Sequence, residues 1–416
     1  MRKILYLGDY VARTGFGTVS KNIIRELRKH FGAELQLDIV AINYFGEPFY
    51  EDENTCIISA RKEDGKDDPH GRYFFLKMVN EGDYDGIFIN QDLGAVVSMV
   101  EVLEFIKKDK KEKNRKVFKS IFYFPVDCKL FYDLVEKLEF FDLLVTYTEF
   151  ARKEVLRLRP ELQPKLKVVP HGNNSKEFYP LPAEEKKAFR SEYFGEHADK
   201  FIITNVSRNQ PRKDIPSTIF GFEEAVKNWD ERLPQPLLYL HMHPRDPLGW
   251  DLRAIIKQTS LKEDVNVKLL PKEYEEAMVE TETVNKIYNA SDVALTTCLG
   301  GGWELIYSEA ASCKVPIIVP YVTSFIEMSQ YGKNAYMLET LYPYCNTIDN
   351  IVREQVDIYE VADTIIHVAK SKQGLLDDMG ANISLQERIE ENYKWVKKKL
   401  EWQEVCKQWI EYFKIY

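Results

Sequence analysis

The sequence lacks the features that would indicate a secreted, zinc-binding or membrane-spanning protein. Its six cysteines are scattered over 416 residues, with no CxxC pair and no histidine at zinc-finger spacing. Reduced thiols in a cytoplasmic protein are therefore expected. No run approaches the ~20 apolar residues that would span a bilayer. The short apolar run at the N-terminus is too brief for a signal peptide, so we expect a cytoplasmic protein without an integral membrane segment.

An excess of positive charge is also missing. The formal net charge is -9, which gives no overall basic field for gripping nucleic acid. One stretch is an exception, because residues 107–119 contain eight lysine or arginine side chains. Such a run is usually a solvated helix end and loop. The alternative is that it steers a polyanionic acceptor such as DNA.

Short apolar runs alternate with longer helical patterns, which indicates parallel α/β structure in a chain long enough for two domains. Brief buried strands are predicted twice, on either side of a polar, linker-like stretch at residues 173–182. The predicted strands are residues 4–7, 37–42, 86–89, 119–124 and 143–147, then 201–206, 237–241, 265–270, 293–296 and 316–319. Interleaved helices are predicted at residues 18–31, 216–227 and 304–312, and the chain reads as helical from about residue 382 onward.

Glycines follow the first predicted strand. Gly15, Phe16 and Gly17 precede the first predicted helix, where glycine permits close backbone approach and unpaired N–H groups attract an anion. The spacing is not GxGxxG, and no acidic residue ends the second strand as a dinucleotide ribose would require. A plain tight turn is the alternative.

A basic loop follows the strand that opens the second half. Arg208 and Lys213 lie between that strand and a helix with Pro216 near its first turn. Guanidinium and ammonium groups at this edge suit a diphosphate. The alternative is a solvated basic loop.

A run of three glycines is the most informative motif. Gly301 and Gly302 continue from Gly300 after a predicted strand, and Trp303 leads into a helix that carries Glu304 and Glu309. A carboxylate at Glu309, among apolar neighbours, needs a polar partner. Ribose hydroxyls would supply one, and a lysine on the same helix face is the alternative.

These segments together resemble the GT-B retaining glycosyltransferases of family 4, from Met1 to about Phe413. The motifs that carry the resemblance are Val169-Pro170-His171-Gly172-Asn173-Asn174, Arg208 with Lys213, Gly302-Trp303 with Glu309, and Lys286 to Val293. The resemblance implies an α/β protein of two Rossmann-like domains facing across a cleft. We expect an acceptor-side domain at residues 1–175, a nucleotide-sugar domain at 176–385 and a terminal helix at 386–416 that packs back on the first domain.

The resemblance also implies roles for the motifs. Arg208 and Lys213 would neutralise the diphosphate, and Glu309 would bind the ribose. The base would meet the backbone near Leu270 and Pro271. The amides of Gly15 to Gly17 would close over the donor. His171, Gly301, Gly302, Trp303 and Glu304 are further donor-site candidates.

Asp127 is the candidate on the acceptor side, because it follows the strand predicted at residues 119–124. Several relatives place a histidine or aspartate in this region near the reacting centre. Asp127 would orient the sugar or take the acceptor proton. A turn or N-cap aspartate is the alternative.

One departure from the family pattern concerns the donor sugar. The family motif has two glutamates separated by seven residues, and counting back from Glu309 the first falls on Gly301. Sugar choice, or activity itself, depends on what replaces that carboxylate. Glu304 would substitute only if the loop is shifted.

The sequence therefore predicts a hexosyl- or pentosyltransferase (EC 2.4) with a UDP- or GDP-sugar donor and no cofactor or metal. His241 and His243 alone do not make a metal site. The acceptor would be a glycan, a lipid-linked sugar or a hydroxymethylated DNA base. Two alternatives remain: a nucleotide-sugar-binding protein without transfer activity, and a GT-B-type epimerase. Alanine at Arg208 or Lys213 is expected to lower turnover while leaving the Tm nearly unchanged. The oligomeric state stays open.

Overall fold

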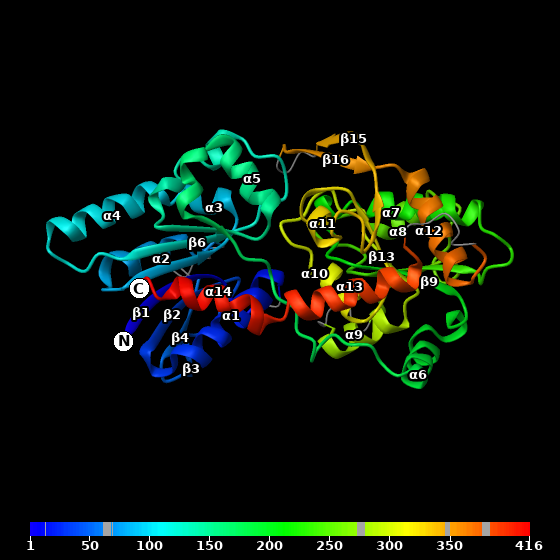
Figure 1. The fold of residues 1–416 in the computed structure, drawn as a ribbon, viewed down its shortest axis with the longest axis horizontal. Helices are drawn as coiled ribbons and strands as arrows, with labels where there is room; N and C mark the ends of the chain where they lie inside the picture. Colours follow the sequence, from blue (N-terminus) through cyan, green and yellow to red (C-terminus); the bar gives the residue numbers. More distant parts are fainter. Residues whose placement is uncertain (13, 61–67, 69, 273–278, 346–349, 377–382) are drawn as a thin grey trace. The chain divides into compact units, whose positions relative to one another are not determined.

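The computed structural model describes residues 1–12, 14–60, 68, 70–272, 279–345, 350–376 and 383–416. The chain forms two compact units (Figure 1). Unit 1 comprises Met1–Gly172 and Trp402–Tyr416, and unit 2 comprises Asn173–Glu401. Each has a largely parallel sheet with helices on both faces, which confirms the predicted α/β class.

Unit 1 contains an eight-stranded sheet in the order β3-β4-β2-β1-β5-β6-β7-β8. Only the β3–β4 pair at one edge is antiparallel. The strands are β1 (Arg2–Asp9), β2 (Leu35–Ile42), β3 (Phe49–Asp52), β4 (Thr55–Ser59), β5 (Gly86–Asn90), β6 (Lys119–Phe124), β7 (Leu143–Thr146) and β8 (Leu166–Val168). The central strands are buried on both sides, so they read as continuous apolar runs.

Alternate side chains of these strands serve opposite faces of the sheet, as the two-residue period of a strand requires. Phe122 and Phe124 join one core cluster with residues of α2, α4 and α5, whereas Tyr123 packs against Trp409 of α14 on the other face. The helices of unit 1 are α1 (Gly15–Phe31), α2 (Arg72–Glu81), α3 (Leu93–Val97), α4 (Val100–Glu112), α5 (Glu149–Leu158) and α14 (Trp402–Phe413).

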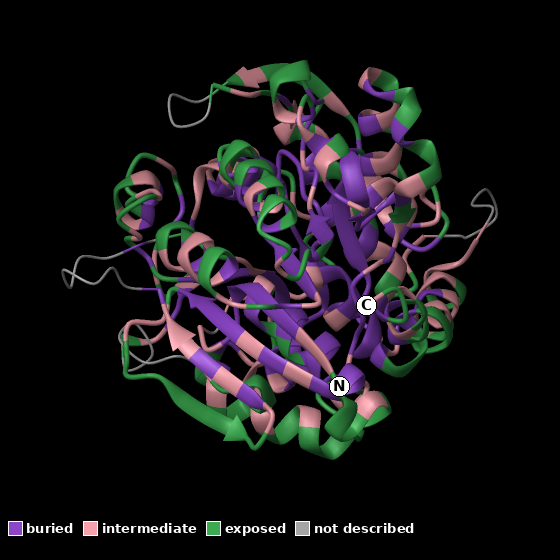
Figure 2. Ribbon diagram, turned by 90° about the vertical axis from the view of Figure 1, so that its left-hand side faces the viewer, coloured by how far each residue is buried: buried purple, intermediate pink, exposed green. Residues whose placement is uncertain are grey.

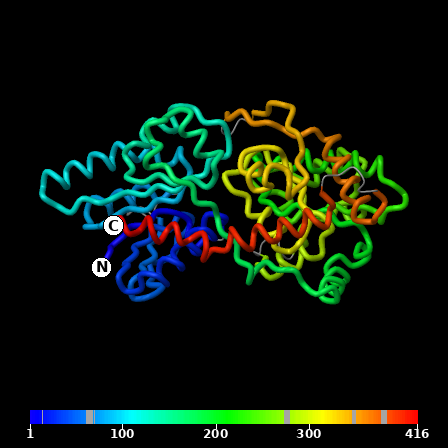
Figure 3. Tube along the Cα trace, in the orientation of Figure 1, coloured from blue at the N-terminus to red at the C-terminus, as the bar shows by residue number. Residues whose placement is uncertain are grey.

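The C-terminal helix α14 completes unit 1. The Trp409 ring lies 5.2 Å from the ring of Phe88 and 4.8 Å from that of Tyr123. The Arg2 Nε donates to the Tyr416 carbonyl at 3.3 Å, so the two termini lie side by side (Figure 3). The apolar stripe of this helix is therefore a packing surface, as its amphipathic pattern predicts.

Unit 2 contains a six-stranded parallel sheet in the order β11-β10-β9-β12-β13-β14. Numbered from the start of the unit this is the order 3-2-1-4-5-6 of a doubly wound nucleotide-binding fold. The strands are β9 (Phe201–Val206), β10 (Pro236–His241), β11 (Val267–Leu269), β12 (Val293–Leu295), β13 (Ile317–Pro320) and β14 (Tyr336–Leu338), with an antiparallel hairpin of β15 (Thr340–Cys345) and β16 (Val352–Val356).

Helices cover both faces of this sheet. Ile203 and Leu238 face α7, α8 and α12, whereas Ile202 and Tyr239 face α6 and α9. Figure 2, in which unit 1 faces the viewer, shows the same arrangement there, with central strands largely buried and outer helix faces exposed. The helices are α6 (Ala183–Phe194), α7 (Ile215–Lys227), α8 (Leu252–Ile256), α9 (Thr281–Ala290), α10 (Leu305–Ser312), α11 (Thr323–Met328), α12 (Ile358–Lys372) and α13 (Leu385–Lys399).

The stretch that looked like a linker is held against unit 2. The Tyr179 N–H donates to Asn285 Oδ1 at 3.1 Å and the Leu181 N–H donates to Asn289 Oδ1 at 2.8 Å. Both asparagines belong to α9, so this segment has fixed backbone partners. The helical C-terminus consists of two helices, with α13 against α10 in unit 2 and α14 against α1 in unit 1. Asn382, where the helical pattern was expected to begin, lies outside the described residues.

Candidate functional site

The strand order of unit 2 reverses between β9 and β12, which are paired neighbours. The loop 207–214 leaves the carboxyl end of β9, and the loop 296–304 leaves the carboxyl end of β12. Ligands of open α/β sheets bind at this switch point, outside the carboxyl ends of the strands. The two motifs that the sequence singled out in this half therefore lie together.

Lys213 and Glu304 join the two loops through a buried ion pair. The Lys213 ammonium contacts one carboxylate oxygen of Glu304, and Arg212 Nη1 lies 2.9 Å from the other. Lys213 is 8% exposed and Glu304 is 6% exposed, so water screens neither group well. Burial by itself would raise the pKa of the Glu304 carboxyl, but Lys213 and Arg212 hold that pKa below its ordinary value. Glu304 is thus an anion in an apolar setting.

Neutral hydrogen bonds fix the same two loops behind the ion pair. Thr297 Oγ1 donates to the Asp214 carbonyl at 2.7 Å and lies 2.7 Å from the Thr218 hydroxyl. Asp214 adopts a left-handed conformation at φ 45°, and its carboxylate accepts from Gln355 Nε2 at 2.9 Å. These bonds position Lys213, because Asp214 is its neighbour in the turn before α7.

Gly301 leaves the space that Glu304 uses. A Cβ atom built on Gly301 would collide with the Glu304 carboxylate. Glu304 is the N-cap residue of α10, and its side chain reaches back over the glycine loop. A side chain at position 301 would therefore have to displace the Glu304 carboxylate from its present place.

Other residues of the glycine loop are also engaged within unit 2. The Gly301 N–H donates to Thr323 Oγ1 at 2.9 Å, so it is not part of an open row of amides. Gly302 is buried and Trp303 is half-buried. Arg212 Nη1 reaches the Gly300 carbonyl in addition to Glu304, which links the basic loop to the glycines.

Arg208 differs from Lys213 in its surroundings. Its Nε lies 3.0 Å from Asp246 Oδ2, and its side chain is 59% exposed. Such a surface pair contributes little to stability. The Arg208 guanidinium is therefore accessible to an incoming anion, whereas the Lys213 ammonium is held by Glu304.

Glu309 lies in the second turn of α10 and faces α9. Its Oε2 accepts a hydrogen bond from the Tyr288 hydroxyl at 2.9 Å. Burial raises the pKa of the Glu309 carboxyl to about 7, and the Tyr288 hydrogen bond opposes only part of this rise. Its partner is thus a tyrosine of another helix, and a lysine on the same helix face is not its partner. Leu270 and Pro271 follow β11 directly, with Leu270 buried and Pro271 half-buried.

The predicted residues of unit 1 also follow strands at the carboxyl edge of their sheet. The Gly17 N–H donates to the capping Thr14 Oγ1 at 3.0 Å, so the helix cap satisfies one of the three expected amides. Gly15 and Phe16 occupy the first turn of α1, where amides lack helix-internal partners. Asp127 lies after β6 and is half-buried.

His171 follows β8 and is buried against aromatic rings. Its ring centroid lies 4.1 Å from that of Tyr147 and 5.7 Å from that of Tyr123. Tyr147 in turn donates to Asn90 Oδ1 at 2.9 Å, at the end of β5. His171 therefore belongs to a polar and aromatic cluster in the interior of unit 1.

Reasoning from the sequence missed Arg212, Asp246 and Tyr288. Arg212 is adjacent to Lys213 in the sequence. Two adjacent cations in one short turn are a signal that both contact the same anion, here Glu304. Tyr288 lies within the segment that resembled the family, but only the fold shows that its hydroxyl meets Glu309. Asp246 follows β10, a neighbour of β9 in the sheet, which explains its contact with Arg208.

The strand orders of the two sheets and the similarity to solved structures define the class of fold: the chain has the GT-B fold, with two Rossmann-like units. No protein-family model matches the sequence. A sucrose-phosphate synthase structure from Thermosynechococcus elongatus matches with a TM-score of 0.67 at 14% identity, covering 100% of this chain and 98% of the other. HepE of Anabaena, in complex with UDP-glucose, matches with a TM-score of 0.67 at 14% identity over 100% of both chains.

The sequence comparison also finds a sucrose-phosphate synthase. A probable sucrose-phosphate synthase of Thermosipho melanesiensis is 24% identical over 196 residues, which are 46% of this chain and 41% of the relative. The match thus spans less than half of either protein. Separately, no helix among the described residues is both long enough and apolar enough to cross a membrane.

Proposed function

We propose that this chain is a retaining glycosyltransferase that takes a sugar from a UDP-sugar and passes it to a hydroxyl acceptor. The observation that carries the proposal is the convergence of Lys213, Arg212 and Glu304 at the switch point of unit 2. UDP is preferred to GDP because HepE, which shares the fold, forms a complex with UDP-glucose.

The charges suit a leaving diphosphate. As the bond between the anomeric carbon and the diphosphate breaks, negative charge grows on the phosphate oxygens. Preorganised cations stabilise such charge most strongly where water is excluded. Lys213 would supply a buried ammonium, and Arg208 an accessible guanidinium with a fork of donors. Glu309, which would accept hydrogen bonds from the ribose, completes the donor site.

Glu304 would take the part of the missing first glutamate. Its carboxylate lies in the space that a side chain at Gly301 would enter, and Lys213 and Arg212 keep it ionised. We assign it a place near the donor sugar. Asp127 of unit 1 would orient that sugar or accept the proton of the acceptor hydroxyl.

The acceptor is proposed to be a glycan or a lipid-linked sugar rather than a DNA base. The basic stretch at residues 107–119 meets carboxylates of its own unit. Lys107 and Lys119 contact Asp142, and Lys116 contacts Asp85. Arg115 contacts Asp83. These contacts reduce the positive field that would steer a polyanion.

Moving the carboxylate from position 304 to position 301 tests the proposal. Purified protein is incubated with UDP-glucose, and the release of UDP is measured with and without glycan acceptors. Glu304→Ala should lower turnover about 100-fold, and Gly301→Glu added to Glu304→Ala should recover part of it, because a carboxylate returns to the same space. Gly301→Glu with Glu304 intact should by itself lower turnover, because the new side chain collides with the Glu304 carboxylate. Conversion of the sugar without UDP release would indicate an epimerase, and nucleotide binding without turnover would indicate a binding protein.

A further inference from the structure

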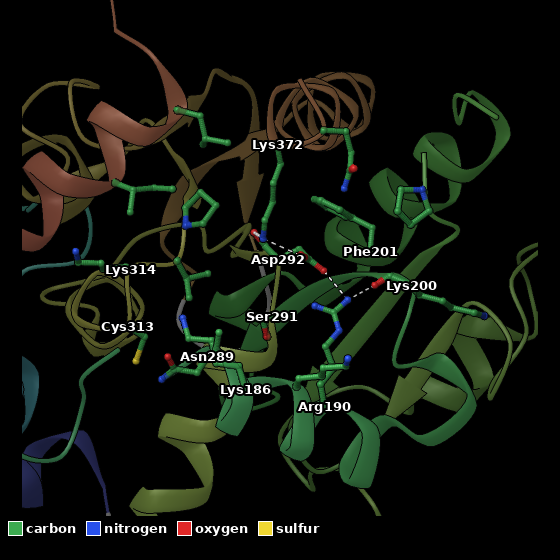
Figure 4. A pocket seen from close by; sticks show the side chains of 18 of the residues that line it. Lys186, Arg190, Lys200, Phe201, Asn289, Ser291, Asp292, Cys313, Lys314 and Lys372 are labelled. Atoms are coloured by element: carbon green, nitrogen blue, oxygen red, sulfur yellow. Dashed lines mark hydrogen bonds and ion pairs between the residues drawn. The ribbon is translucent and has the colours of Figure 1, made fainter. Parts of the chain in front are cut away.

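A second candidate site lies at the opposite edge of the unit 2 sheet. A cavity of about 980 Å³ is lined by residues near the amino ends of the strands. Phe201 begins β9 and Asp292 immediately precedes β12 (Figure 4). Pro316 immediately precedes β13. The loops that hold Lys213 and Glu304 leave the carboxyl ends of these strands, so the cavity is distinct from the proposed donor site.

The lining of this cavity carries more positive than negative side chains, whereas the chain as a whole has a negative net charge. Two carboxylates, Asp199 and Asp292, line it. The six cationic side chains in the lining are Lys186, Lys187, Arg190, Lys200, Lys314 and Lys372. The full chain has a net charge of -9. A concentration of cations in one concave surface of an acidic protein focuses a field that attracts anions.

Asp292 is already neutralised. Its carboxylate accepts from Arg190 Nη2 at 2.9 Å and from Lys372 Nζ at 2.7 Å, and the Ile202 N–H adds a third bond at 2.8 Å (Figure 4). Burial tends to raise the pKa of Asp292, but Lys372 and Arg190 hold that pKa below its ordinary value. Asp292 therefore contacts two of the six cations, and the other four are not in contact with it.

Of these four cations, Lys186 is half-buried, and within the described part of the chain its ammonium has no ion pair or hydrogen bond. Burial lowers the pKa of Lys186, and the positive charges of Lys372 and Lys314 lower it further. Lys314 is held by Glu390 at 2.7 Å, on helix α13, which lines the same cavity. An ammonium placed among cations in a partly dry cavity is stabilised by a bound anion.

We propose that this cavity binds a small polyanion, a molecule that carries two or more phosphate or carboxylate groups. The volume falls in the range of about 300–1000 Å³ typical of small-molecule sites, which is larger than one phosphate ion requires. Lys186 would hold one anionic group, with Lys187 within the same lining to receive another, whereas the Lys200 ammonium donates to the Val265 carbonyl. The inference does not depend on the proposed transfer reaction.

Equilibrium binding tests this assignment. Isothermal titration of the full chain uses three probes: inorganic pyrophosphate, fructose 1,6-bisphosphate and citrate. At least one should bind, and the set that binds distinguishes phosphate from carboxylate recognition. Lys186→Gln should weaken binding at least tenfold, since a charge-assisted hydrogen bond is lost, and Lys186→Arg should retain most of the affinity. Lys257→Gln is the matched control, because Lys257 is exposed at the end of α8.

Lysine labelling locates the bound probe. Acetylation by an N-hydroxysuccinimide ester, followed by mass spectrometry, should modify Lys186, and the bound probe should protect it while Lys257 is modified as before. The assignment is overturned if no probe binds, if Lys186→Gln binds equally well, or if the bound probe leaves Lys186 unprotected. Lys186→Gln leaves no described carboxylate unpaired, so we expect it to fold.

Discussion

The two units share a sheet topology but differ at the point where the strand order reverses. In unit 1 the neighbours β1 and β5 end among hydroxyls, amides and one carboxyl: the Asp9 carboxylate accepts from Thr14 and from Asn43 Nδ2 at 2.9 Å. Burial raises the pKa of Asp9. In unit 2 the corresponding point holds Lys213, Arg212 and Glu304. One topology therefore presents hydrogen-bonding groups in one unit and concentrated charge in the other, which favours the diphosphate on unit 2.

The largest expected effect comes from removing the buried ammonium of unit 2. Lys213→Ala should lower turnover about 100- to 1000-fold, because a donor aimed at the leaving group is lost. The Tm should also fall, contrary to the expectation from sequence, since Glu304 loses one of its two cationic partners inside the protein. We expect a loss of about 2 kcal/mol in the free energy of unfolding, less than for a fully broken buried pair, because Arg212 remains. Denaturant titration and UDP release measure the two effects.

A second substitution separates the two roles of Lys213. Glu304→Gln combined with Lys213→Ala removes the buried charge that was left unpaired, so stability should largely return. Turnover should stay low, because the ammonium and the Glu304 carboxylate are then both absent. Recovery of turnover in this double variant would mean that neither Lys213 nor Glu304 acts in turnover, and the contrast between the units would lose its functional meaning.

Arg208 provides the next test, because it lies on the same loop at the surface. Arg208→Ala should weaken UDP binding about 10- to 100-fold, the value of a charge-assisted hydrogen bond. The Tm should change little, because the Arg208 side chain is 59% exposed and Asp246 keeps its hydrogen bond from the Leu248 N–H. Arg245→Ala is a suitable control, since that arginine is 80% exposed and follows β10. Equal effects of the two variants on UDP affinity would contradict a specific role for Arg208.

The third test concerns the protonation state of the Glu309 carboxyl. The pKa of Glu309 is raised to about 7 from an ordinary 4.5. The folded protein therefore holds a proton that the unfolded chain releases, and the stability contribution is present below pH 4.5 and is lost as the pH rises to 7. Ribose hydroxyls prefer the ionised form as acceptor, and the ionised fraction of Glu309 falls between pH 7 and 6, so UDP affinity should fall about fivefold over that range. Glu309→Gln should abolish the part of this dependence that UDP's own titration does not explain. An identical pH profile in that variant would remove Glu309 from the site.

Much of the fold could be predicted because the buried strands are short apolar runs in a repeating order. The predicted strands at residues 119–124 and 201–206 coincide with β6 and β9. The first helix begins earlier than its apolar period suggests, because Thr14 caps it at Gly15. The edge strand β3 was not predicted, since all four of its residues are exposed and it lacks an apolar run.

The site could be predicted in part. Motif spacing placed Arg208, Lys213 and Glu309 after the right strands, because parallel sheets bring the carboxyl ends of their strands to one edge. Which of these side chains contact each other could not be predicted from the spacing of the motifs along the sequence. Lys213 and Glu304 are 91 residues apart, and their contact follows from which strands are neighbours in the sheet. The use of the Gly301 space by Glu304 depends on the local path of the loop before α10.

The smallest expected effect concerns the helix cap of unit 1. Thr14→Ala removes the acceptor for the Gly17 N–H and the donor to Asp9, so the free energy of unfolding should fall by about 1 kcal/mol, as for other lost N-caps. UDP affinity should change less than twofold, if the nucleotide is held by unit 2. Thr14→Ser, which keeps the hydroxyl, should retain most of the stability. A loss of UDP affinity comparable to that of Arg208→Ala would instead show that the start of α1 holds part of the donor, and the division of charge and hydrogen bonding between the units would have to be redrawn.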